Sequence, residues 1–408
     1  MEEEEIYLQE VAEGGKLSGV EIDYEEIHPF DTDKISIDKK IITMDTCLRR
    51  LEQSTINLAP DFQRNFIWNL DKKSRLIESL ILKIPIPMFY VASDEKGNLT
   101  IVDGLQRLST IRDFILGEEF LRTRNLEKKG DGFRLAGLEF LSKKYDNFNF
   151  KEIPIDIQNR LLETEFTFTI INPGTQEEVK RNIFKRINTG GEPLTPQEIR
   201  HALYNGKSTK LLKQLSENPN FIKATSGSVN DSRMSARELI LRFITFAVRG
   251  YENYPKNSSM DTFLSDTMII INNYPDLNSK EINKTFPNID IKSQLKIKEI
   301  EKIEEKFDIG MQRAFNLFEK HTFRRSSGDK KLAPINKSLF EVWGVALSNL
   351  SESEYIKLNK KKNEFEKMNI ELLNDIDFKK SISNDSWKTS GVKTRFEKAH
   401  NLLQEIIN

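Results

Sequence analysis

The chain has little cysteine, little histidine and no long apolar run. Its single cysteine, Cys47, excludes a disulfide framework and is typical of a reducing compartment. No two of its four histidines have metal-ligand spacing, which argues against a zinc site: His28, His201, His321 and His400. No apolar run approaches transmembrane length, and the opening MEEEE has the wrong charge for a signal peptide. These absences predict a soluble, cytoplasmic protein with no membrane partner.

Neither sign of charge dominates the chain. Lysine and arginine number 62 against 63 aspartates and glutamates, which leaves a formal net charge of −1. This balance argues against a protein that coats DNA through overall positive charge, whereas a local basic groove stays open. With 408 residues and 38% hydrophobic content, the chain is long enough for two or three domains with cores of their own.

The spacing of apolar residues divides the chain into three parts. Residues 1–34 are acidic with few periodic apolar positions, which predicts a mobile or loosely docked arm. Residues 35–205 mix helical and strand patterns, and Thr43 and Asp71 are the predicted caps of the first two helices. In residues 206–408 strand signals nearly vanish and six or more helical segments follow. The predicted fold class is α+β, a domain with a small mixed sheet followed by an all-α helical domain.

The segment IVDGLQRLST, residues 101–110, is the centre of the first domain. It reads as the second strand of a hairpin that stops at Gly104 and continues as a helix. Such a junction directs backbone N–H groups, the positive end of the helix dipole and the side chains of Asp103, Gln106 and Arg107 to one place. Because Arg107 adds a planar fork suited to phosphate or carboxylate, the segment predicts an anion site. A purely structural turn is the alternative.

A second polar segment, FKRINTGGEPLTPQEIR, reads as a helix–loop–helix. Thr195 and Glu198 predict a capping box at the start of its second helix. Charged and amide side chains crowd the ends of the loop: Lys185, Arg186, Asn188 and Arg200. The pattern fits either a ligand-facing loop or a surface elbow.

Four segments in order, DFQRNFIW, LIESLILKIPIPMFYV, VDGLQRLSTI and FKRINTGGEPLTPQEIR, closely resemble the DUF262 family. Its members include the N-terminal domain of GmrSD-type modification-dependent restriction enzymes and of phosphorothioate-dependent defence proteins. The resemblance covers residues from about 40 to 205 and implies a ParB/sulfiredoxin-like fold. The family signature Asp-Gly-Gln-Gln-Arg reads Asp103-Gly104-Leu105-Gln106-Arg107 here, so its first glutamine is replaced.

The resemblance implies nucleotide binding and hydrolysis coupled to the sensing or cutting of foreign DNA in phage defence. It implies catalytic roles for Asp103, Gln106 and Arg107, with Mg²⁺ held by Asp103 together with the nucleoside triphosphate (NTP). The implied nucleotide-binding residues are Gln63, Arg64, Gly104, Arg107, Lys185, Arg186, Asn188 and Arg200. Leu105 weakens the expectation of hydrolysis more than that of binding, because backbone and Arg107 contacts survive the replacement.

Two other functions stay open at this point. The first is a ParB-like, DNA-binding nuclease, and the second is a non-catalytic scaffold whose helical domain binds protein partners. Many relatives carry a His-Asn-His nuclease domain, DUF1524, to which this chain shows no match, so nuclease activity of that type is not expected. A separate nuclease or defence protein is then the expected partner, and a homodimer is expected by analogy. The nucleotide and the DNA modification are not legible from the sequence.

Overall fold

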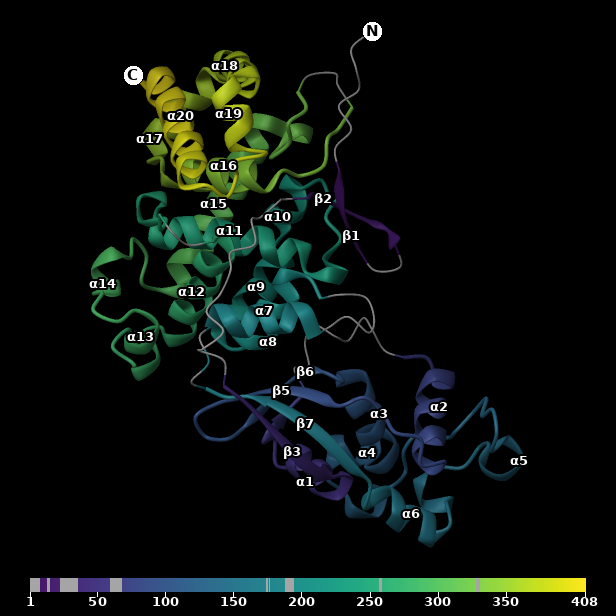
Figure 1. The fold of residues 1–408 in the computed structure, drawn as a ribbon. Helices are drawn as coiled ribbons and strands as arrows, with labels where there is room; N and C mark the ends of the chain where they lie inside the picture. Colours follow the sequence, from purple (N-terminus) through teal and green to yellow (C-terminus); the bar gives the residue numbers. More distant parts are fainter. Residues whose placement is uncertain are drawn as a thin grey trace. The chain divides into compact units, whose positions relative to one another are not determined.

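The computed structural model describes residues 8–12, 15–22, 36–58, 68–173, 175, 177–187, 194–256, 259–327 and 331–408 (Figure 1). The chain forms two units. The sheet unit is Phe30–Leu194, and the helical unit combines Met1–Pro29 with Thr195–Asn408. The division therefore falls between Leu194 and Thr195, whereas the sequence analysis set it after residue 205.

A mixed five-stranded sheet lies at the centre of the sheet unit. Its spatial order is β3 (Ile37–Thr43), β7 (Glu165–Ile171), β5 (Phe89–Ser93), β6 (Leu99–Asp103) and β4 (Ile56–Asn57). The β3–β7 and β5–β6 pairs are antiparallel, whereas β7–β5 and β6–β4 are parallel. The predicted hairpin whose second strand stops at Gly104 is thus confirmed as β5–β6, and its register sets Tyr90 opposite Asp103.

The hydrophobic core of the sheet unit is formed by buried residues of its helices together with those of the sheet. They are α1 (Met44–Glu52), α2 (Leu70–Ile81), α3 (Leu105–Ile115), α4 (Glu118–Thr123), α5 (Ser142–Tyr145), α6 (Ile155–Leu162) and α7 (Glu177–Ile187), with 3₁₀ turns η3 (Leu126–Lys128) and η4 (Phe150–Glu152). Thr43 caps α1 as predicted, its hydroxyl accepting from the N–H of Thr46. The predicted cap of α2 is wrong: Asn69, in extended conformation, accepts from the N–H of Lys72, and Asp71 lies inside the first turn.

The helical unit begins with a hairpin from the N-terminal end of the chain. Its strands are β1 (Gln9–Val11) and β2 (Leu17–Glu21), and Val20 is fully buried. The N–H of Glu21 donates to the carbonyl of Ile335, and the N–H of Ile335 donates to that of Gly19, both at 2.9 Å. For these residues the prediction of a loosely docked arm is wrong, because backbone pairing at Ile335 and ion pairs such as Glu21–Arg325 at 2.9 Å fix the hairpin.

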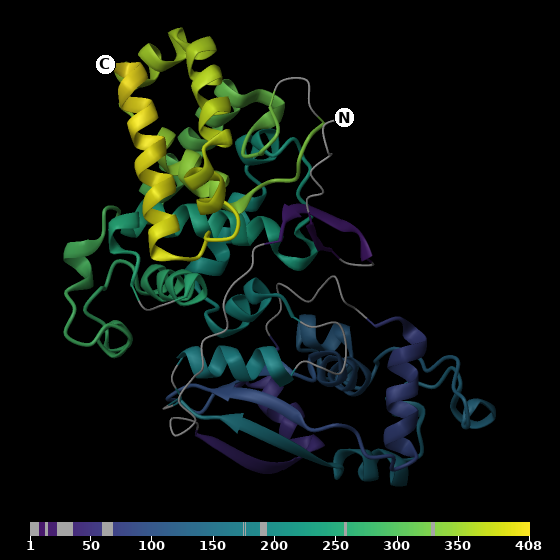
Figure 2. The same ribbon diagram turned by 45° about the horizontal axis from the view of Figure 1, so that its top comes forward.

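The remainder of the helical unit is a bundle of helices (Figure 2). It is built around α11 and α16, nearly all of whose residues are buried. Its helices are α8 (Pro196–Leu203), α9 (Lys207–Ser216), α10 (Pro219–Ala224), α11 (Ser235–Arg249), α12 (Met260–Asn273), α13 (Lys280–Thr285), α14 (Ile291–Gln294), α15 (Ile300–Phe318), α16 (Lys337–Asn349), α17 (Glu352–Lys360), α18 (Lys362–Asn374), α19 (Ile376–Ser381) and α20 (Thr389–Ile407), with η5 (Asp231–Arg233), η6 (Tyr251–Asn253) and η7 (Glu319–His321). The predicted α+β fold class is confirmed. None of the described helices has the length and apolar character needed to cross a bilayer.

Buried ion pairs connect the helices of this bundle. Glu341 on α16 is fully buried, accepts from Arg395 Nε at 2.8 Å and accepts from Arg242 Nη1 at 3.3 Å. Burial alone would raise the pKa of Glu238 on α11, but Lys337, Arg200 and Arg242 hold that pKa below its usual range. Charged side chains thus form part of the interior, and Glu341 and Glu238 are each matched there by opposite charges.

Candidate functional site

The β6–α3 junction in the sheet unit has the backbone that the sequence predicted. Gly104 has φ +98° and ψ 10° and directly precedes the first turn of α3. A Cβ added there would lie 2.8 Å from Phe89 Cε1 and closer still to Phe89 Cδ1. Both the left-handed conformation and the contact with the ring require glycine, which lets the chain turn from strand to helix in one residue.

Arg107 is held by protein atoms on the first turn of α3. Its Nη2 donates to Asp103 Oδ2 at 2.9 Å and to the carbonyl of Met88 at 3.3 Å, and its Nη1 donates to the carbonyl of Pro87. The guanidinium lies 4.8 Å from the centre of the Phe89 ring, and the side chain is only 11% exposed. Burial lowers the pKa of Arg107 and the neighbouring Asp103 opposes that shift. Arg107 therefore orients Asp103 and fixes the segment that leads into β5.

Asp103 and Gln106 present the accessible polar groups at the junction. The Asp103 side chain is 32% exposed, so part of it meets solvent while its Oδ2 accepts from Arg107. Gln106 is half-buried, and its Oε1 accepts from the N–H of Trp68 at 3.3 Å. The first-turn N–H groups of a helix have no partners within the helix. The junction thus combines an oriented carboxylate, a side-chain amide and a helix start.

Leu105, which replaces the first glutamine of the signature, belongs to the hydrophobic core. It is 9% exposed and clusters with the buried residues of β5, β6 and α3. The polar atoms of the junction come from Asp103, Gln106 and Arg107 instead. Leucine at this position is explained by packing, and it leaves the geometry of the helix start intact.

The junction fits a metal ion that arrives with a nucleotide better than a metal held by the protein alone. Across the part of the chain that the structure describes, no three histidine, cysteine, aspartate or glutamate side chains gather to hold a metal. Mg²⁺ in nucleotide sites is commonly held by one or two carboxylates together with substrate phosphates. The partly exposed carboxylate of Asp103 meets that requirement.

The other predicted site residues are distributed over both units. Gln63, Arg64 and Asn188 lie outside the described residues, and Lys185 and Arg186 belong to α7. Arg200 lies on α8 in the helical unit and is 1% exposed. Its Nε donates to Gln197 Oε1 at 2.9 Å, its Nη1 pairs with Asp261, and its Nη2 lies 3.5 Å from Glu238 Oε2. A nucleotide-binding role for these six residues stays a prediction.

Sequence reasoning missed the partners of Arg107 and Gln106. The carbonyls of Pro87 and Met88, the ring of Phe89 and the N–H of Trp68 carry no polar side-chain signal. The register of the β5–β6 hairpin could have predicted the contacts with Pro87, Met88 and Phe89, because it sets the start of β5 beside Asp103. Pro87 and Phe89 also line a pocket of about 540 Å³ with Lys83, Arg160 and Thr167.

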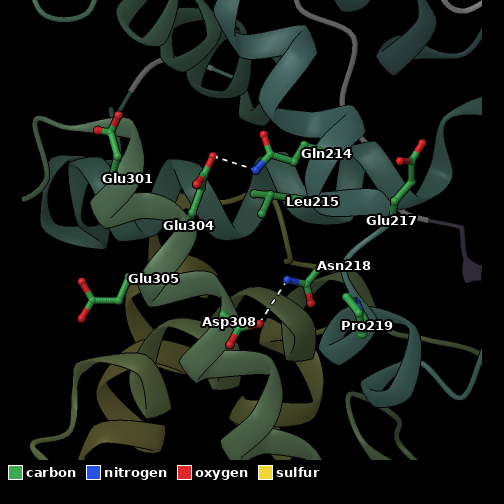
Figure 3. A pocket seen from close by; sticks show the side chains of 9 residues that line it. All are labelled: Gln214, Leu215, Glu217, Asn218, Pro219, Glu301, Glu304, Glu305 and Asp308. Atoms are coloured by element: carbon green, nitrogen blue, oxygen red, sulfur yellow. Dashed lines mark hydrogen bonds between the residues drawn. The ribbon is translucent and has the colours of Figure 1, made fainter.

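A second hollow, of about 480 Å³, lies in the helical unit and is acidic (Figure 3). Asp308 Oδ1 accepts from Asn218 Nδ2 at 3.1 Å, and Glu304 Oε1 accepts from Gln214 Nε2 at 3.0 Å. All of the ionisable residues that line it are carboxylates: Glu217, Glu301, Glu304, Glu305 and Asp308. Because these carboxylates carry the same negative charge as phosphate and repel it, this hollow is not a candidate nucleotide site.

Comparison with known families bears on the junction directly. Residues 48–205 match the model of the GmrSD restriction endonuclease N-terminal domain. This region is a GmrSD N-terminal domain. The GmrSD domain begins in α1, contains the whole β6–α3 junction and extends through α8. The family is part of modification-dependent restriction systems. No curated protein matches the chain.

Proposed function

We propose that the GmrSD domain binds an NTP with Mg²⁺ at the β6–α3 junction. Hydrolysis of that nucleotide would make the protein a regulatory or sensor component of a modification-dependent restriction system. The observation that carries the proposal is the partly exposed Asp103 carboxylate, held at 2.9 Å by Arg107 beside the glycine-capped start of α3. Family membership over residues 48–205 supports the same reading.

Each residue of the junction has a distinct part in this proposal. The first-turn N–H groups of α3 bind phosphate oxygens, because a helix start attracts negative charge. Asp103 holds Mg²⁺ or orients the attacking water with its solvent-facing oxygen, and Mg²⁺ supplies neutralisation of phosphate charge. Arg107 keeps the carboxylate in one orientation, and Gln106 presents an amide at the same helix end. The pocket lined by Pro87 and Phe89 is the candidate space for the base and ribose.

One observation favours the scaffold as the second candidate function. The Arg107 guanidinium binds three protein oxygens and is 11% exposed, so its fork faces the protein itself. In a scaffold these contacts would serve only to join β5, β6 and α3. The two functions differ in whether Asp103 has a ligand, which a binding experiment decides.

The test is calorimetric titration of the full chain with each of the four NTPs and Mg²⁺, with phosphate release measured on the same samples. We expect Asp103→Asn to weaken Mg²⁺-dependent binding by about tenfold or more, which corresponds to about 1.4 kcal/mol or more. The matched control is Arg112→Gln on the same helix, because Arg112 pairs with Asp113 at 2.6 Å and takes no part in the junction.

The outcomes separate the alternatives. Binding and turnover that depend on Asp103 support the proposal in full. Binding without turnover reduces the protein to a nucleotide-gated sensor and implicates Leu105. No binding of any NTP, with or without DNA, overturns the proposal and leaves the scaffold.

A further inference from the structure

A polar pocket of about 290 Å³ lies in the helical unit, apart from the residues of the nucleotide proposal. Its walls come from the end of α15, the turn η7 with the segment after it, and α18. Its polar and charged lining residues are Lys320, His321, Arg324, Ser326, Ser327, Lys362 and Asn369, together with the carboxylates of Glu319 and Glu366. The three cations Lys320, Arg324 and Lys362 outnumber the two carboxylates, so hydrogen-bond donors predominate, as in an anion site.

Arg324 is a buried cation with no carboxylate partner among the described residues. It is 6% exposed. Its Nη2 donates to Ser228 Oγ at 2.8 Å and to the carbonyl of Thr225 at 3.2 Å, and its Nη1 donates to the carbonyl of Ala333. All three acceptors are neutral, and Nε has no hydrogen-bond partner among the described residues. Burial lowers the pKa of Arg324.

The other buried arginines of the helical unit show how unusual this is. Each of them lies within 4.0 Å of a carboxylate oxygen: Arg200, Arg233, Arg242, Arg249, Arg313 and Arg395. A buried charge without a counter-charge costs free energy, and each of these six arginines has a carboxylate as its counter-charge. At Arg324 the counter-charge is missing from the described structure, at the wall of a pocket.

Asn369 on α18 adds a second unsatisfied group to the same pocket. The residue is 7% exposed, and its buried Oδ1 has no hydrogen-bond partner in the described structure. An unpaired buried acceptor costs free energy as well. Two residues that line the pocket, Arg324 and Asn369, therefore each hold a buried polar atom, Nε and Oδ1, that has no described partner.

Lys362 and Ser326 complete the set of groups around Arg324. Lys362 Nζ lies 2.6 Å from Glu319 Oε1, and the Glu319 side chain is 68% exposed, so solvent screens this ion pair. Ser326 Oγ accepts from the N–H of Ala333 at 3.0 Å and lies 2.9 Å from His321 Nδ1. Several donors of different kinds suit the three or four oxygens of a phosphate better than the two of a carboxylate.

We propose that this pocket binds a small phosphorylated ligand. Its phosphate meets Arg324 Nε and Lys362, and a hydroxyl or amino group of the ligand donates to Asn369 Oδ1. The volume of about 290 Å³ suits a ligand of mononucleotide or sugar-phosphate size. The helical unit would then carry a ligand site of its own, whether or not the junction in the sheet unit binds an NTP.

The test titrates the full chain with inorganic phosphate, a nucleoside 5′-monophosphate and a hexose 6-phosphate at constant ionic strength, followed by calorimetry and ³¹P NMR. An Asp103→Asn background without Mg²⁺ weakens the contribution of the β6–α3 junction to the signal, and the α18 variants below assign the remainder. Lys362→Gln should weaken all three by about tenfold. Asn369→Ala should weaken the two esters and leave inorganic phosphate unchanged. Lys367→Gln and Asn374→Ala, on the same helix but not among the lining residues, are the controls and should bind like the parent.

One further variant distinguishes a ligand from a carboxylate of the chain. Asp329 is the second residue after Ser327 in the sequence and lies outside the described residues. Under the proposal, Asp329→Asn binds phosphate at least as tightly as the parent chain. Phosphate binding that appears only in Asp329→Asn would assign the counter-charge to the chain itself and overturn the proposal. Absence of binding by all three probes at millimolar concentration, or equal losses in the controls, would overturn it too.

Discussion

Replacement of Gly104 by alanine is the sharpest test of how the β6–α3 junction is built. The new methyl group would meet the ring of Phe89, which is fully buried. That ring has little room to move, since its centre lies 5.1 Å from that of Phe168 and 5.3 Å from that of Phe166. The guanidinium of Arg107 lies on it at 4.8 Å. A shift of Phe89 would therefore displace the group that orients Asp103.

Two costs add in Gly104→Ala. An alanine at φ +98° carries a penalty of about 1–2 kcal/mol for the left-handed conformation. Overpacking against a fixed ring adds about 1–3 kcal/mol. The total is about 2–5 kcal/mol. Gly97→Ala in the β5–β6 turn is the matched control, because Gly97 has φ +81° but no described heavy atom within 4 Å of its Cβ position. It should show the conformational penalty alone.

Amide hydrogen exchange of the full chain measures both variants locally. Gly104→Ala should lower the opening free energy of β5, β6 and the start of α3 by about 2–5 kcal/mol, and Gly97→Ala by about 1–2 kcal/mol. Under the proposed function, Gly104→Ala should also lose NTP binding while Gly97→Ala keeps it. Equal exchange in the two variants would refute the steric argument at Phe89.

Three further predictions concern buried groups. Glu78 accepts three backbone N–H groups, and although burial alone would raise its pKa, these bonds hold the pKa below 4.5; Glu78→Gln should cost about 1.5–3 kcal/mol at pH 7. Because the pKa of Glu78 is lower in the folded state than in the unfolded state, its ionised carboxylate stabilises the fold at pH values above the unfolded-state pKa. This stability is lost as the pH falls through the folded-state pKa, so the urea unfolding curves of the variant and the wild type should converge below pH 4.5. Glu341→Gln leaves Arg242 and Arg395 buried without this carboxylate, so it should lower the free energy of unfolding by about 3–5 kcal/mol, measured by thermal unfolding. A loss under about 1 kcal/mol would contradict the proposed role of the ion pairs. Burial raises the pKa of Cys47 to about 12, so a thiol reagent at pH 8 should label the chain only in urea.

The parts of the fold that the sequence predicted are those fixed by local signals. The strand pattern that stops at Gly104 and the helical pattern after it were enough for the β5–β6 hairpin and the start of α3. Thr195 and Glu198 form the predicted capping box at α8, with the N–H of Glu198 3.2 Å from Thr195 Oγ1. These contacts join residues close in sequence, so the pattern that predicts them also contains both partners.

The parts that the sequence missed depend on partners far along the chain. The N-terminal segment lacks apolar periodicity, and its docking rests on Glu10 with Lys337 and Glu21 with Arg325. No sequence pattern near either glutamate predicts these ion pairs. At the junction, the roles of Pro87 and Met88 depend on the register between β5 and β6, which the hydrophobic pattern constrains but does not give to the residue.

The buried arginines of the helical unit are another feature that the sequence does not predict. A sequence reading places arginine on the surface, because charged residues are mostly exposed. The structure instead buries Arg200, Arg242, Arg395 and Arg324, and only the first three have carboxylates among the described residues. Arg324 differs from them because it lacks a counter-charge among the described residues and because it lines a pocket, and neither feature is a property of any sequence motif. The site proposed there follows from comparing buried arginines with one another, so it stands or falls with phosphate binding and not with membership in the GmrSD family.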